Sequence, residues 1–549
     1  MTLLSAVAPV AETPVDWWLA EQADLTAVER FAQRHDGALV PAQARYYRDL
    51  IPRTRPAPGQ QYGFEVDLDA CTGCKACVTA CHSLNGLDDG ESWRSITLVT
   101  GSGATGAFQQ TVTGACHHCV DPACLNGCPV DAYEKDPLTG IVAHLDDQCI
   151  GCSYCTLTCP YEVPVYNHRR GIVRKCDMCT GRLAAGEAPA CAQACPTGAI
   201  AIRLVDTASL VATAGDATLV PGSAPSAITV PSTRYLSTSR RVDDTIVLGS
   251  RTGPARSHPP LTVMLVLTQL SVGAFIIDLV LRALTARGAG VLPVVDAMIV
   301  AVAGVLALGV SVGHLGRPRY GYRAIIGLRH SWLSREIVAF GGFMSLAVAY
   351  AIALLFDPPQ HLQGLVDALG GTAAATGVMG VMCSVLIYST TRRSSWRPLS
   401  VATKFGLTAL VCGLAAVTWA GVVSAAMLGN SRPNGLDSLD GRLCLVLAAL
   451  VAVKLAGEAS VFRHLTRARN PEGVRRASLL IRDLRTTTVT RFWLGFGAGV
   501  ALPLLIATGG TDGAPTWVGV IAATLVLGGV TAGELAERSL FFTAASPPR

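Results

Sequence analysis

Histidines and charged side chains are scarce in the second half of this sequence. Of its 549 residues only 15% are charged, and after residue 260 the histidines are His314, His330, His361 and His464. A b-type haem in a membrane bundle needs histidine ligands on neighbouring helices. Only His314 is predicted to lie at a helix end within reach of a bilayer, so we expect no haem.

A recognisable export signal is also lacking at the N-terminus. The segment MTLLSAVAPVAETPVDWW has no basic stretch before its short apolar run, carries an acid at Glu12 and contains no twin-arginine pair. We therefore expect that no signal of its own exports the chain. Residues 1–60 contain Pro-rich stretches and are predicted to form an N-terminal extension on the surface.

Cysteine is nearly absent after residue 200. Sixteen of the 19 cysteines lie before it, whereas Cys383, Cys412 and Cys444 are scattered in apolar segments and are expected to be packing residues. The sixteen form four groups, and proline follows the last cysteine in three of them. The groups are Cys71, Cys74, Cys77 and Cys81; Cys116, Cys119, Cys124 and Cys128; Cys149, Cys152, Cys155 and Cys159; and Cys176, Cys179, Cys191 and Cys195.

The spacing C-x2-C-x2-C-x3-C of the first and third groups is that of ferredoxins. Three cysteines in a short loop bind one 4Fe-4S cluster, and the fourth ligates the cluster of a partner motif. This rule predicts a nested pairing: Cys71, Cys74, Cys77 with Cys195; Cys176, Cys179, Cys191 with Cys81; Cys116, Cys119, Cys124 with Cys159; and Cys149, Cys152, Cys155 with Cys128.

Two other uses of so many cysteines are a disulfide scaffold and structural zinc sites. Disulfide scaffolds are typical of small secreted domains. Zinc sites use C-x2-C pairs but require neither the third cysteine nor the Cys-Pro ending. Four 4Fe-4S clusters are therefore expected, with zinc as the alternative.

The predicted fold class is α+β, with two nested dicluster ferredoxin-like modules, followed by an all-α membrane bundle. Residues 61–205 form the four-cluster domain, with strands at 64–68 and 199–204, and 206–260 form a linker. Residues 261–549 form the membrane anchor, in which most apolar stretches have about the 20 residues that span a bilayer. Eight such stretches are predicted, at 261–281, 291–313, 337–356, 372–391, 405–427, 443–461, 492–508 and 517–537.

Four cysteine-containing segments resemble the iron-sulfur subunit of the dimethyl sulfoxide reductase family. They are QYGFEVDLDACTGCKACVTAC, ACHHCVDPACLNGCP, QCIGCSYCTLTCPYEVPVYN and RKCDMCTGRLAAGEAPACAQACP. This resemblance implies a separate molybdopterin-containing catalytic subunit, because the present chain has no such domain and no predicted catalytic residues of its own.

Two further segments, SVGHLGRPRYGYRAIIGLRHSWLSRE and AGELAERSLFF, resemble the membrane anchor subunit of the same family. Together with the first resemblance they imply a fusion of two subunits. The anchor resemblance assigns quinone binding to His314 and Glu336. An imidazole and a carboxylate suit a reaction that moves protons with electrons, although both residues could instead lie in the lipid headgroup region.

Other polar residues of the apolar half are weaker candidates. Lys454 and Glu458 are four residues apart, which predicts an ion pair within one helix. Asp278, Asp296 and Glu534 could belong to a proton path or lie near the membrane surface.

Arginine and lysine are distributed unevenly among the loops between the predicted membrane helices. Arg282, Arg287, Arg432 and Arg442 occupy one set of alternate loops. The other loops carry seventeen: Arg317, Arg319, Arg323, Arg329, Arg335, Arg392, Arg393, Arg397, Lys404, Arg463, Arg467, Arg469, Arg475, Arg476, Arg482, Arg485 and Arg491. The positive-inside rule therefore predicts that the cluster domain and both termini face the cytoplasm.

The sequence thus predicts an electron-transfer and anchor subunit that links the membrane quinone pool to a molybdopterin oxidoreductase of the sulfite dehydrogenase, nitrate reductase or dimethyl sulfoxide reductase type. A subunit of a proton-translocating complex is the alternative. The predicted partners are the catalytic subunit, membrane lipid and quinone, and no nucleic acid.

Overall fold

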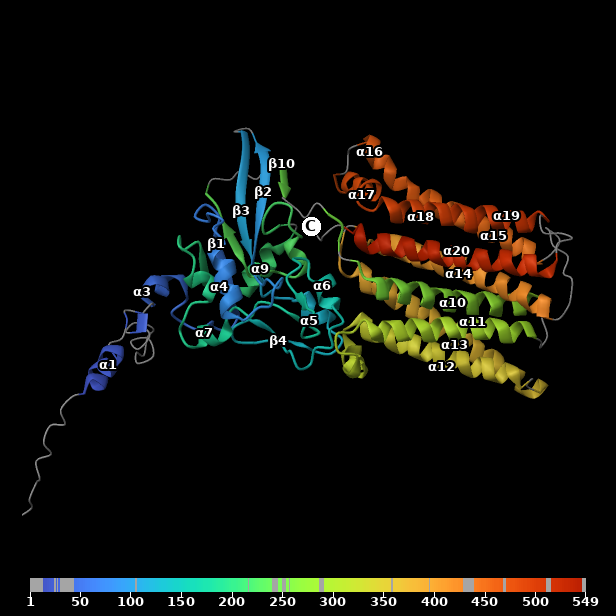
Figure 1. The fold of residues 1–549 in the computed structure, drawn as a ribbon, viewed down its shortest axis with the longest axis horizontal. Coiled ribbons are helices and arrows are strands. Elements are labelled where there is room, and N and C mark those ends of the chain that lie inside the picture. The colour runs from blue at the N-terminus through green and yellow to red at the C-terminus, as the bar shows by residue number, and fades with distance from the viewer. Residues whose placement is uncertain are drawn as a thin grey trace, which may run out of the picture.

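The computed structural model describes residues 13–23, 26, 28–29, 44–103, 106–215, 217–238, 245–248, 253–255, 257–285, 291–356, 359–393, 395–427, 439–467, 471–509 and 515–545. A cysteine-rich α+β domain lies at one end of a bundle of long helices (Figure 1). The expected order of an iron-sulfur domain followed by a helical anchor is confirmed.

The cysteine-rich domain is closed by a sheet that joins its two ends. Strand β1 (Gln60–Asp67) pairs antiparallel with β8 (Ile200–Asp206), with Phe64 opposite Ile202. This confirms both predicted strands. Phe64 and Ile202 are buried in the hydrophobic core that also contains Cys77, Cys81 and Cys191, so the pairing brings the first and fourth cysteine groups together.

Short helices and hairpins lie between these two strands. The helices are α4 (Ala76–Leu84), α5 (Ala123–Gly127), α6 (Tyr154–Thr158), α7 (Thr180–Ala184) and α8 (Ala190–Gln193). Two small hairpins are β4 (Tyr133–Lys135) with β5 (Val142–His144), and β6 (Val165–Asn167) with β7 (Ile172–Arg174). A longer hairpin, β2 (Ser95–Gly103) with β3 (Gly106–Gly114), projects from the domain (Figure 1).

The segment predicted as a linker contributes elements to the cysteine-rich domain. Helix α9 (Thr207–Ala214) follows β8 directly, β9 (Arg234–Leu236) extends the β1–β8 sheet, and β10 (Thr245–Leu248) pairs with β2. Between them, Ser226–Ile228 form a short 3-10 helix. The linker prediction was wrong here because β9 and β10 pair with the edges of β1 and β2, and the Ser-, Pro- and Thr-rich composition of this segment does not indicate strands.

Only part of the predicted N-terminal extension falls within the described residues. Helix α1 (Pro14–Ala23) exposes Trp17 and Trp18, and further along the chain lie α3 (Ala44–Tyr47) and a 3-10 turn, Arg48–Leu50. The Tyr47 side chain is buried against the core of the cysteine-rich domain, so the last part of the extension belongs to that domain.

The helical bundle contains eight helical segments that are long and apolar enough to cross a membrane, counted over the described residues. The predicted number of spans is confirmed. The helices are α10 (Pro259–Thr285), α11 (Val291–Gly313), α12 (Trp332–Leu355), α13 (Gln360–Ser389), α14 (Pro398–Met427), α15 (Leu439–Ala459), α18 (Arg485–Phe496) continuing through a π-turn at Gly497–Ala501 into α19 (Leu502–Ala507), and α20 (Thr516–Thr543).

Two connections that contain helical segments lie at the end of the bundle that faces the cysteine-rich domain (Figure 1), as does the shorter α13–α14 connection with Arg393. The first is a 3-10 segment, η3 (Pro318–Arg329), between α11 and α12. The second comprises a 3-10 turn (Ser460–Phe462), α16 (Arg463–Arg467) and α17 (Pro471–Ile481), between α15 and α18.

The cysteine-rich domain docks on the bundle through η3 and the residues before it. The backbone N–H of Arg317 donates to the carbonyl of Ile150 at 3.0 Å, and that of Gly327 donates to Pro129 at 2.9 Å. Gly316 lies so close to Gly171 that a Cβ atom would overlap the Gly171 carbonyl oxygen. The interface therefore depends on direct backbone contact.

Candidate functional site

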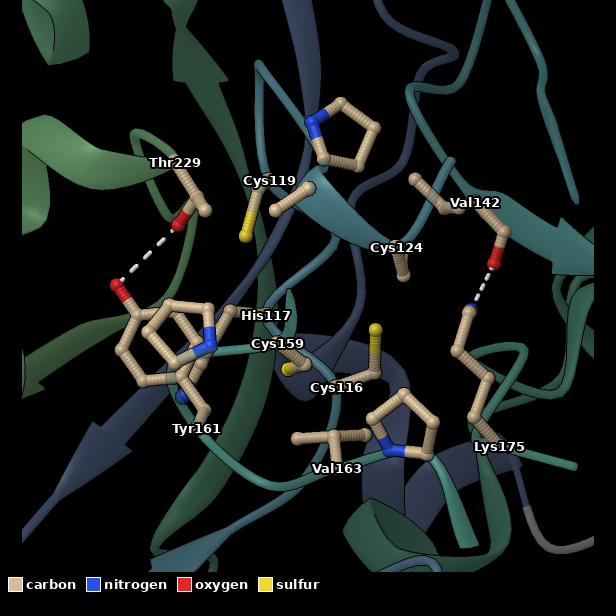
Figure 2. Close-up of a pocket in the computed structure, with 14 residues that line it drawn as sticks. Cys116, His117, Cys119, Cys124, Val142, Cys159, Tyr161, Val163, Lys175 and Thr229 are labelled. Carbon is tan, nitrogen blue, oxygen red and sulfur yellow. Dashed lines mark hydrogen bonds between the residues drawn. The ribbon is translucent and has the colours of Figure 1, made fainter. Parts of the chain in front are cut away.

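Two of the four predicted cysteine sets each line one cavity. Cys116, Cys119, Cys124 and Cys159, named set B here, surround a cavity of about 370 Å³ (Figure 2). Cys71, Cys74, Cys77 and Cys195, named set D, line a second cavity of about 290 Å³. In both cases three cysteines come from one motif and the fourth from its predicted partner.

Set A, Cys128, Cys149, Cys152 and Cys155, is brought together by α5 and α6, which contact each other. Burial and the nearby thiols of Cys128 and Cys149 raise the pKa of Cys152. Burial likewise raises the pKa of Cys128 to about 11, with a contribution from Cys149.

Set C, Cys81, Cys176, Cys179 and Cys191, is brought together by α4 and α8, which also contact each other. Burial, followed by the thiol of Cys191, raises the pKa of Cys81 to about 12. Binding iron requires thiolates, so cluster assembly at such sites releases protons.

The four motifs share one backbone turn. The residue before the second cysteine has a positive φ in each of them: 74° at Gly73, 41° at His118, 72° at Gly151 and 59° at Met178. In two motifs this turn aims the backbone N–H of that residue at the preceding sulfur, at 3.4 Å for both Gly151 to Cys149 and Met178 to Cys176. Because His and Met rarely adopt this conformation, its repetition indicates a common requirement of the ligand loops.

The arrangement of these cysteines also bears on the zinc alternative. Among the described residues, no three His, Cys, Asp or Glu side chains are placed to hold one metal ion. The four cysteines of set B instead face a shared cavity from different sides (Figure 2). This donor set fits a multi-iron cluster better than a single tetrahedral ion.

The four sets follow one another in the order A, B, C, D. The buried phenol of Tyr133 lies near Cys155 and Cys128 of set A and Cys124 of set B. Cys176 of set C interacts electrostatically with Cys116 of set B. Cys77 of set D lies in the same core as Cys191 of set C, so the sets form a continuous row.

A cavity of about 580 Å³ lies where set A meets the helical bundle. Cys152, Tyr154 and Leu157 line it from the cysteine-rich domain. His314 and Glu336 line it from the bundle, with apolar side chains of α10, α11, α12 and α13 completing the wall. Its volume is in the range of small-molecule binding sites.

The His314 ring is held by backbone carbonyl groups. Its Nδ1 lies at hydrogen-bond distance from the carbonyl oxygen of Ser311, and the backbone of Cys152 also lies near the ring. Burial lowers the pKa of His314, while these two carbonyl groups act in the opposite direction. A neutral imidazole can donate to only one of the carbonyls, whereas a protonated ring can donate to both.

Glu336 lies in the first turns of α12 and is buried. Its carboxylate accepts a hydrogen bond from the hydroxyl of Ser384 on α13. The hydroxyl of Tyr154 donates to the carbonyl of Ile387 at 3.1 Å, which ties the wall of the cavity formed by α6 to α13. Both sequence-predicted quinone residues thus line one cavity. Ser311 and Tyr154 line it with them, and Ser384 binds Glu336; these three residues were not predicted.

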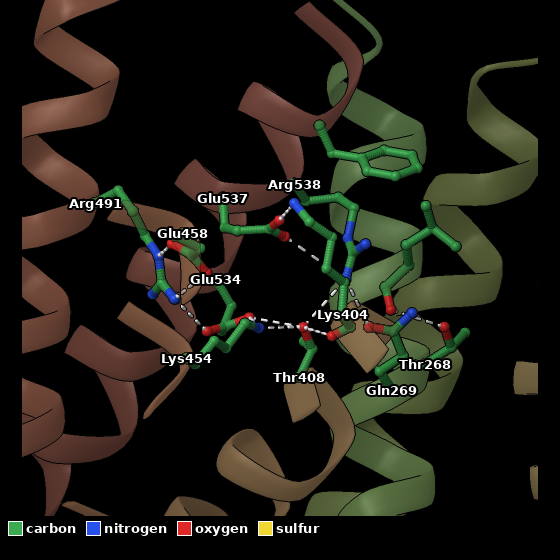
Figure 3. Close-up of polar contacts among 12 residues, drawn as sticks. Thr268, Gln269, Lys404, Thr408, Lys454, Glu458, Arg491, Glu534, Glu537 and Arg538 are labelled. Carbon is green, nitrogen blue, oxygen red and sulfur yellow. Dashed lines mark hydrogen bonds and ion pairs between the residues drawn. The ribbon is translucent and has the colours of Figure 1, made fainter. Parts of the chain in front are cut away.

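The predicted ion pair between Lys454 and Glu458 is wrong. Lys454 pairs with Glu534 of α20, and Glu458 pairs with Arg491 of α18 at 2.8 Å (Figure 3). Arg491 also contacts Glu534 at 3.1 Å. Partners on neighbouring helices are better placed than the one four residues along α15, because the buried Glu534 lies between both cations.

Further polar residues extend this buried group. Glu537 pairs with Lys404 at 2.6 Å, and Arg538 donates to Thr408 and Gln269 at 3.1 and 3.0 Å (Figure 3).

The remaining polar candidates of the bundle, Asp278 and Asp296, are also buried, and Asp278 pairs with Arg282 at 2.6 Å. Cys383, Cys412 and Cys444 are buried, as expected for packing residues.

Comparisons with known proteins identify both parts of the chain. Residues 108–204 match the family model of a 4Fe-4S dicluster domain, and residues 255–543 match that of the DMSO reductase anchor subunit (DmsC). The second match alone covers more than half of the chain.

Three relatives of the first part are subunits of reductases, and each of these three matches spans about three quarters of the relative. The B subunit of the anaerobic dimethyl sulfoxide reductase of Haemophilus influenzae is 38% identical over 156 residues, which are 27% of this chain and 76% of the relative. The corresponding B subunit of Escherichia coli is 40% identical over 154 residues, 27% of this chain and 75% of the relative. The thiosulfate reductase electron transfer subunit PhsB of Salmonella typhi is 37% identical over 153 residues, 27% of this chain and 79% of the relative.

The cysteine-rich domain therefore carries iron-sulfur clusters and transfers electrons, and the bundle is a multi-pass membrane anchor. The chain belongs to the DMSO reductase anchor subunit family, and in the same polypeptide it joins that anchor to an iron-sulfur domain similar to the B subunit of dimethyl sulfoxide reductases.

Proposed function

We propose that this chain passes electrons between membrane quinone and a separate molybdopterin-containing catalytic subunit through four 4Fe-4S clusters. The observation that carries the proposal is the cavity lined jointly by Cys152, His314 and Glu336. A predicted cluster ligand and both predicted quinone residues border one space of suitable size. A quinone ring bound there would lie next to the cluster of set A.

The continuity of the cysteine row supports transfer through all four clusters. Each 4Fe-4S cluster would supply one-electron transfer at its cysteine set. Set A borders the quinone cavity, while Cys74 of set D is exposed on a different part of the domain. Electrons would therefore enter or leave at set D, and the catalytic subunit is expected to bind near it.

Quinone chemistry also requires that protons be taken up or released with the electrons. His314 can donate a hydrogen bond to a quinone oxygen, or accept a proton and then bind both backbone carbonyls that surround it. Glu336 can accept the second proton, and Ser384 fixes the position of its carboxylate. The cavity thus contains one proton-accepting group for each proton of a two-electron, two-proton quinol oxidation.

The arginine distribution supports a cytoplasmic position for the cluster domain. The Arg-rich η3 segment contacts that domain, since Arg317 and Arg323 donate to the carbonyls of Asp146 and Asp147. Arg393, from another Arg-rich loop, pairs with Glu162 at 3.9 Å. Two of the three Arg-rich loops that the positive-inside rule assigns to the cytoplasm therefore bind the cluster domain.

The test is reduction of the clusters by quinol in the purified full-length chain, reconstituted in lipid nanodiscs. The chain should contain about sixteen irons, and a menaquinol or ubiquinol analogue should reduce the cluster of set A, as followed by electron paramagnetic resonance. Zinc in place of iron, or clusters that chemical reductants reduce but no quinol does, would contradict the proposal. Identification of the protein that co-purifies with the chain would test the catalytic partner and indicate the substrate.

A further inference from the structure

Lys175 is a buried cation at the junction between sets B and C. It directly precedes Cys176 of set C, yet its side chain lines the cavity of set B (Figure 2). Its Nζ donates to the backbone carbonyls of Val142 and, at 3.0 Å, Cys176. Electrostatically it acts on Cys116 and Cys124 of set B as well as on Cys176. One positive charge therefore serves two neighbouring cysteine sets.

Arg94 occupies the corresponding position at the junction between sets C and D. Its guanidinium is buried, lies 4.8 Å from the ring centroid of Phe64 and donates to the Thr113 hydroxyl at 3.2 Å. It acts electrostatically on Cys191 and Cys176 of set C and on Cys77 of set D. The same Thr113 hydroxyl lies 3.6 Å from the Cys77 sulfur, so Arg94 is connected to both sets.

Neither cation has a carboxylate partner among the ion pairs of the described residues. The Nε and Nη2 atoms of Arg94 also lack hydrogen-bond acceptors within the part of the chain that the structure describes. An unpaired buried charge is costly, and buried charges are normally paired or bound to a group of opposite charge. The anionic groups next to these side chains are the cysteine sets themselves.

We propose that Lys175 and Arg94 are electrostatic positioning residues that stabilise the reduced, more negative state of the clusters beside them. The inference rests on the proposed four-cluster function. Because both cations act on set C, the cluster there is expected to be the most strongly affected. An electron that passes between sets B and D would then be most stable on the cluster of set C. This is electron transfer alone, in which no bond forms or breaks.

The size of the effect follows from Coulomb's law. For charges a few ångströms apart at an effective dielectric constant of about 20, loss of one unit charge changes the equilibrium between oxidised and reduced cluster by a factor of ~10 or more. For a one-electron couple, a factor of ten corresponds to ~59 mV. Removing either cation should therefore lower the potentials of the two adjacent clusters, and removing both should lower set C the most.

The experiment is a redox titration of the purified full-length chain, followed by electron paramagnetic resonance, with iron content measured in parallel. Arg94→Gln should lower the potentials at sets C and D by at least ~59 mV, the tenfold factor above, and Lys175→Met should do the same at sets B and C. Arg94→Lys and Lys175→Arg should keep them near the parent values. Arg169→Gln is the matched control, since Arg169 is an exposed arginine of the same domain that pairs with Asp88.

Unchanged potentials in Arg94→Gln and Lys175→Met with full iron content would overturn the inference, as would equal shifts in the charge-retaining variants. If either Arg94→Gln or Lys175→Met loses iron, the potentials measured in the other variant still test the inference. Loss of iron in both would indicate a purely structural role and would also overturn it. The proposed function is tested separately on the unsubstituted chain, by its iron content and by the signals of its four clusters. Failure of the inference and failure of the proposed function can therefore be told apart.

Discussion

The side chain of His314 lies against the backbone of Cys152 across the boundary between the two domains. Cys152 belongs to set A, whereas His314 follows the second membrane helix, α11. Both also line the cavity that contains Glu336. A residue proposed to handle quinone thus also contacts the loop that carries a proposed cluster ligand, so binding at the cavity and the position of set A are linked.

Replacing His314 should separate quinol chemistry from cluster chemistry. In His314→Gln, reduction of the clusters by quinol is expected to slow by about 10²-fold or more, the usual contribution of a general acid or base. Reduction by dithionite, which needs no quinone site, should be unaffected. Stopped-flow spectroscopy of the cluster absorbance measures both rates.

The matched control is His361→Gln, because His361 is an exposed histidine at the start of α13, at the opposite end of the bundle from His314. It should reduce at the parent rate with either reductant. Parent-like quinol kinetics in His314→Gln would remove this residue from the site.

The contact between the two domains should be sensitive to a single methyl group at Gly316. A Cβ atom there would overlap the carbonyl of Gly171, so Gly316→Ala must move the cysteine-rich domain away from the bundle. A misplacement of about 1 Å can cost up to 10²-fold in rate, and we expect quinol-driven reduction to slow roughly tenfold while iron content is unchanged.

Gly313→Ala is the control for this substitution, since no atom lies within 4 Å of the position that its Cβ would occupy. Quinol-driven reduction in Gly313→Ala should proceed at the parent rate. Equal rates for Gly316→Ala and the parent would show that the close approach to Gly171 does not limit quinol-driven reduction.

The buried ionic group of the bundle should contribute to stability as a unit. Lys454→Met leaves the carboxylate of Glu534 with Arg491 and the Thr408 hydroxyl as partners. Breaking a buried pair from one side typically costs about 3–5 kcal/mol. We expect a marked fall in the midpoint temperature of unfolding, measured by thiol-reactive dye fluorescence in detergent.

The double variant Lys454→Met/Glu534→Gln should recover part of that loss, because it also removes the buried carboxylate that has lost one of its cationic partners. Arg397→Met, at an exposed arginine before α14, should unfold at the parent temperature. If Lys454→Met alone were as stable as the parent, the group would not hold α14, α15, α18 and α20 together.

The grouping of the cysteines around the cavities of sets B and D was predictable from the sequence, because the expected ligation pattern follows local spacing. The third cysteine of each loop and the exchange of the fourth are properties of the motif, and the cavities of sets B and D contain the predicted partners. The number of membrane spans was predictable for a similar reason, since the length of an apolar run is itself the signal.

Contacts between segments that are distant in the sequence were harder to predict. His314 and Glu336 were predicted from the sequence, but not that Cys152 borders the same cavity, which depends on Gly316 and Gly327 docking against the cysteine-rich domain. Arg94 and Lys175 gave no signal, because a single basic residue near a cysteine motif resembles a surface charge. The Lys454–Glu458 pair failed because spacing within one helix cannot reveal partners on α18 and α20.

The last prediction concerns the proton-accepting role of Glu336. Glu336→Gln keeps the shape of the side chain but cannot take up a proton, so quinol oxidation should slow by about 10²-fold, whereas binding of an unreactive quinone analogue should weaken far less. Ser384→Ala removes only the hydroxyl that orients the carboxylate, and a smaller loss, about tenfold or less, is expected from one hydrogen bond. If Ser384→Ala impaired turnover as much as Glu336→Gln, or if both chiefly weakened analogue binding, Glu336 would serve to bind quinone and not to accept its proton.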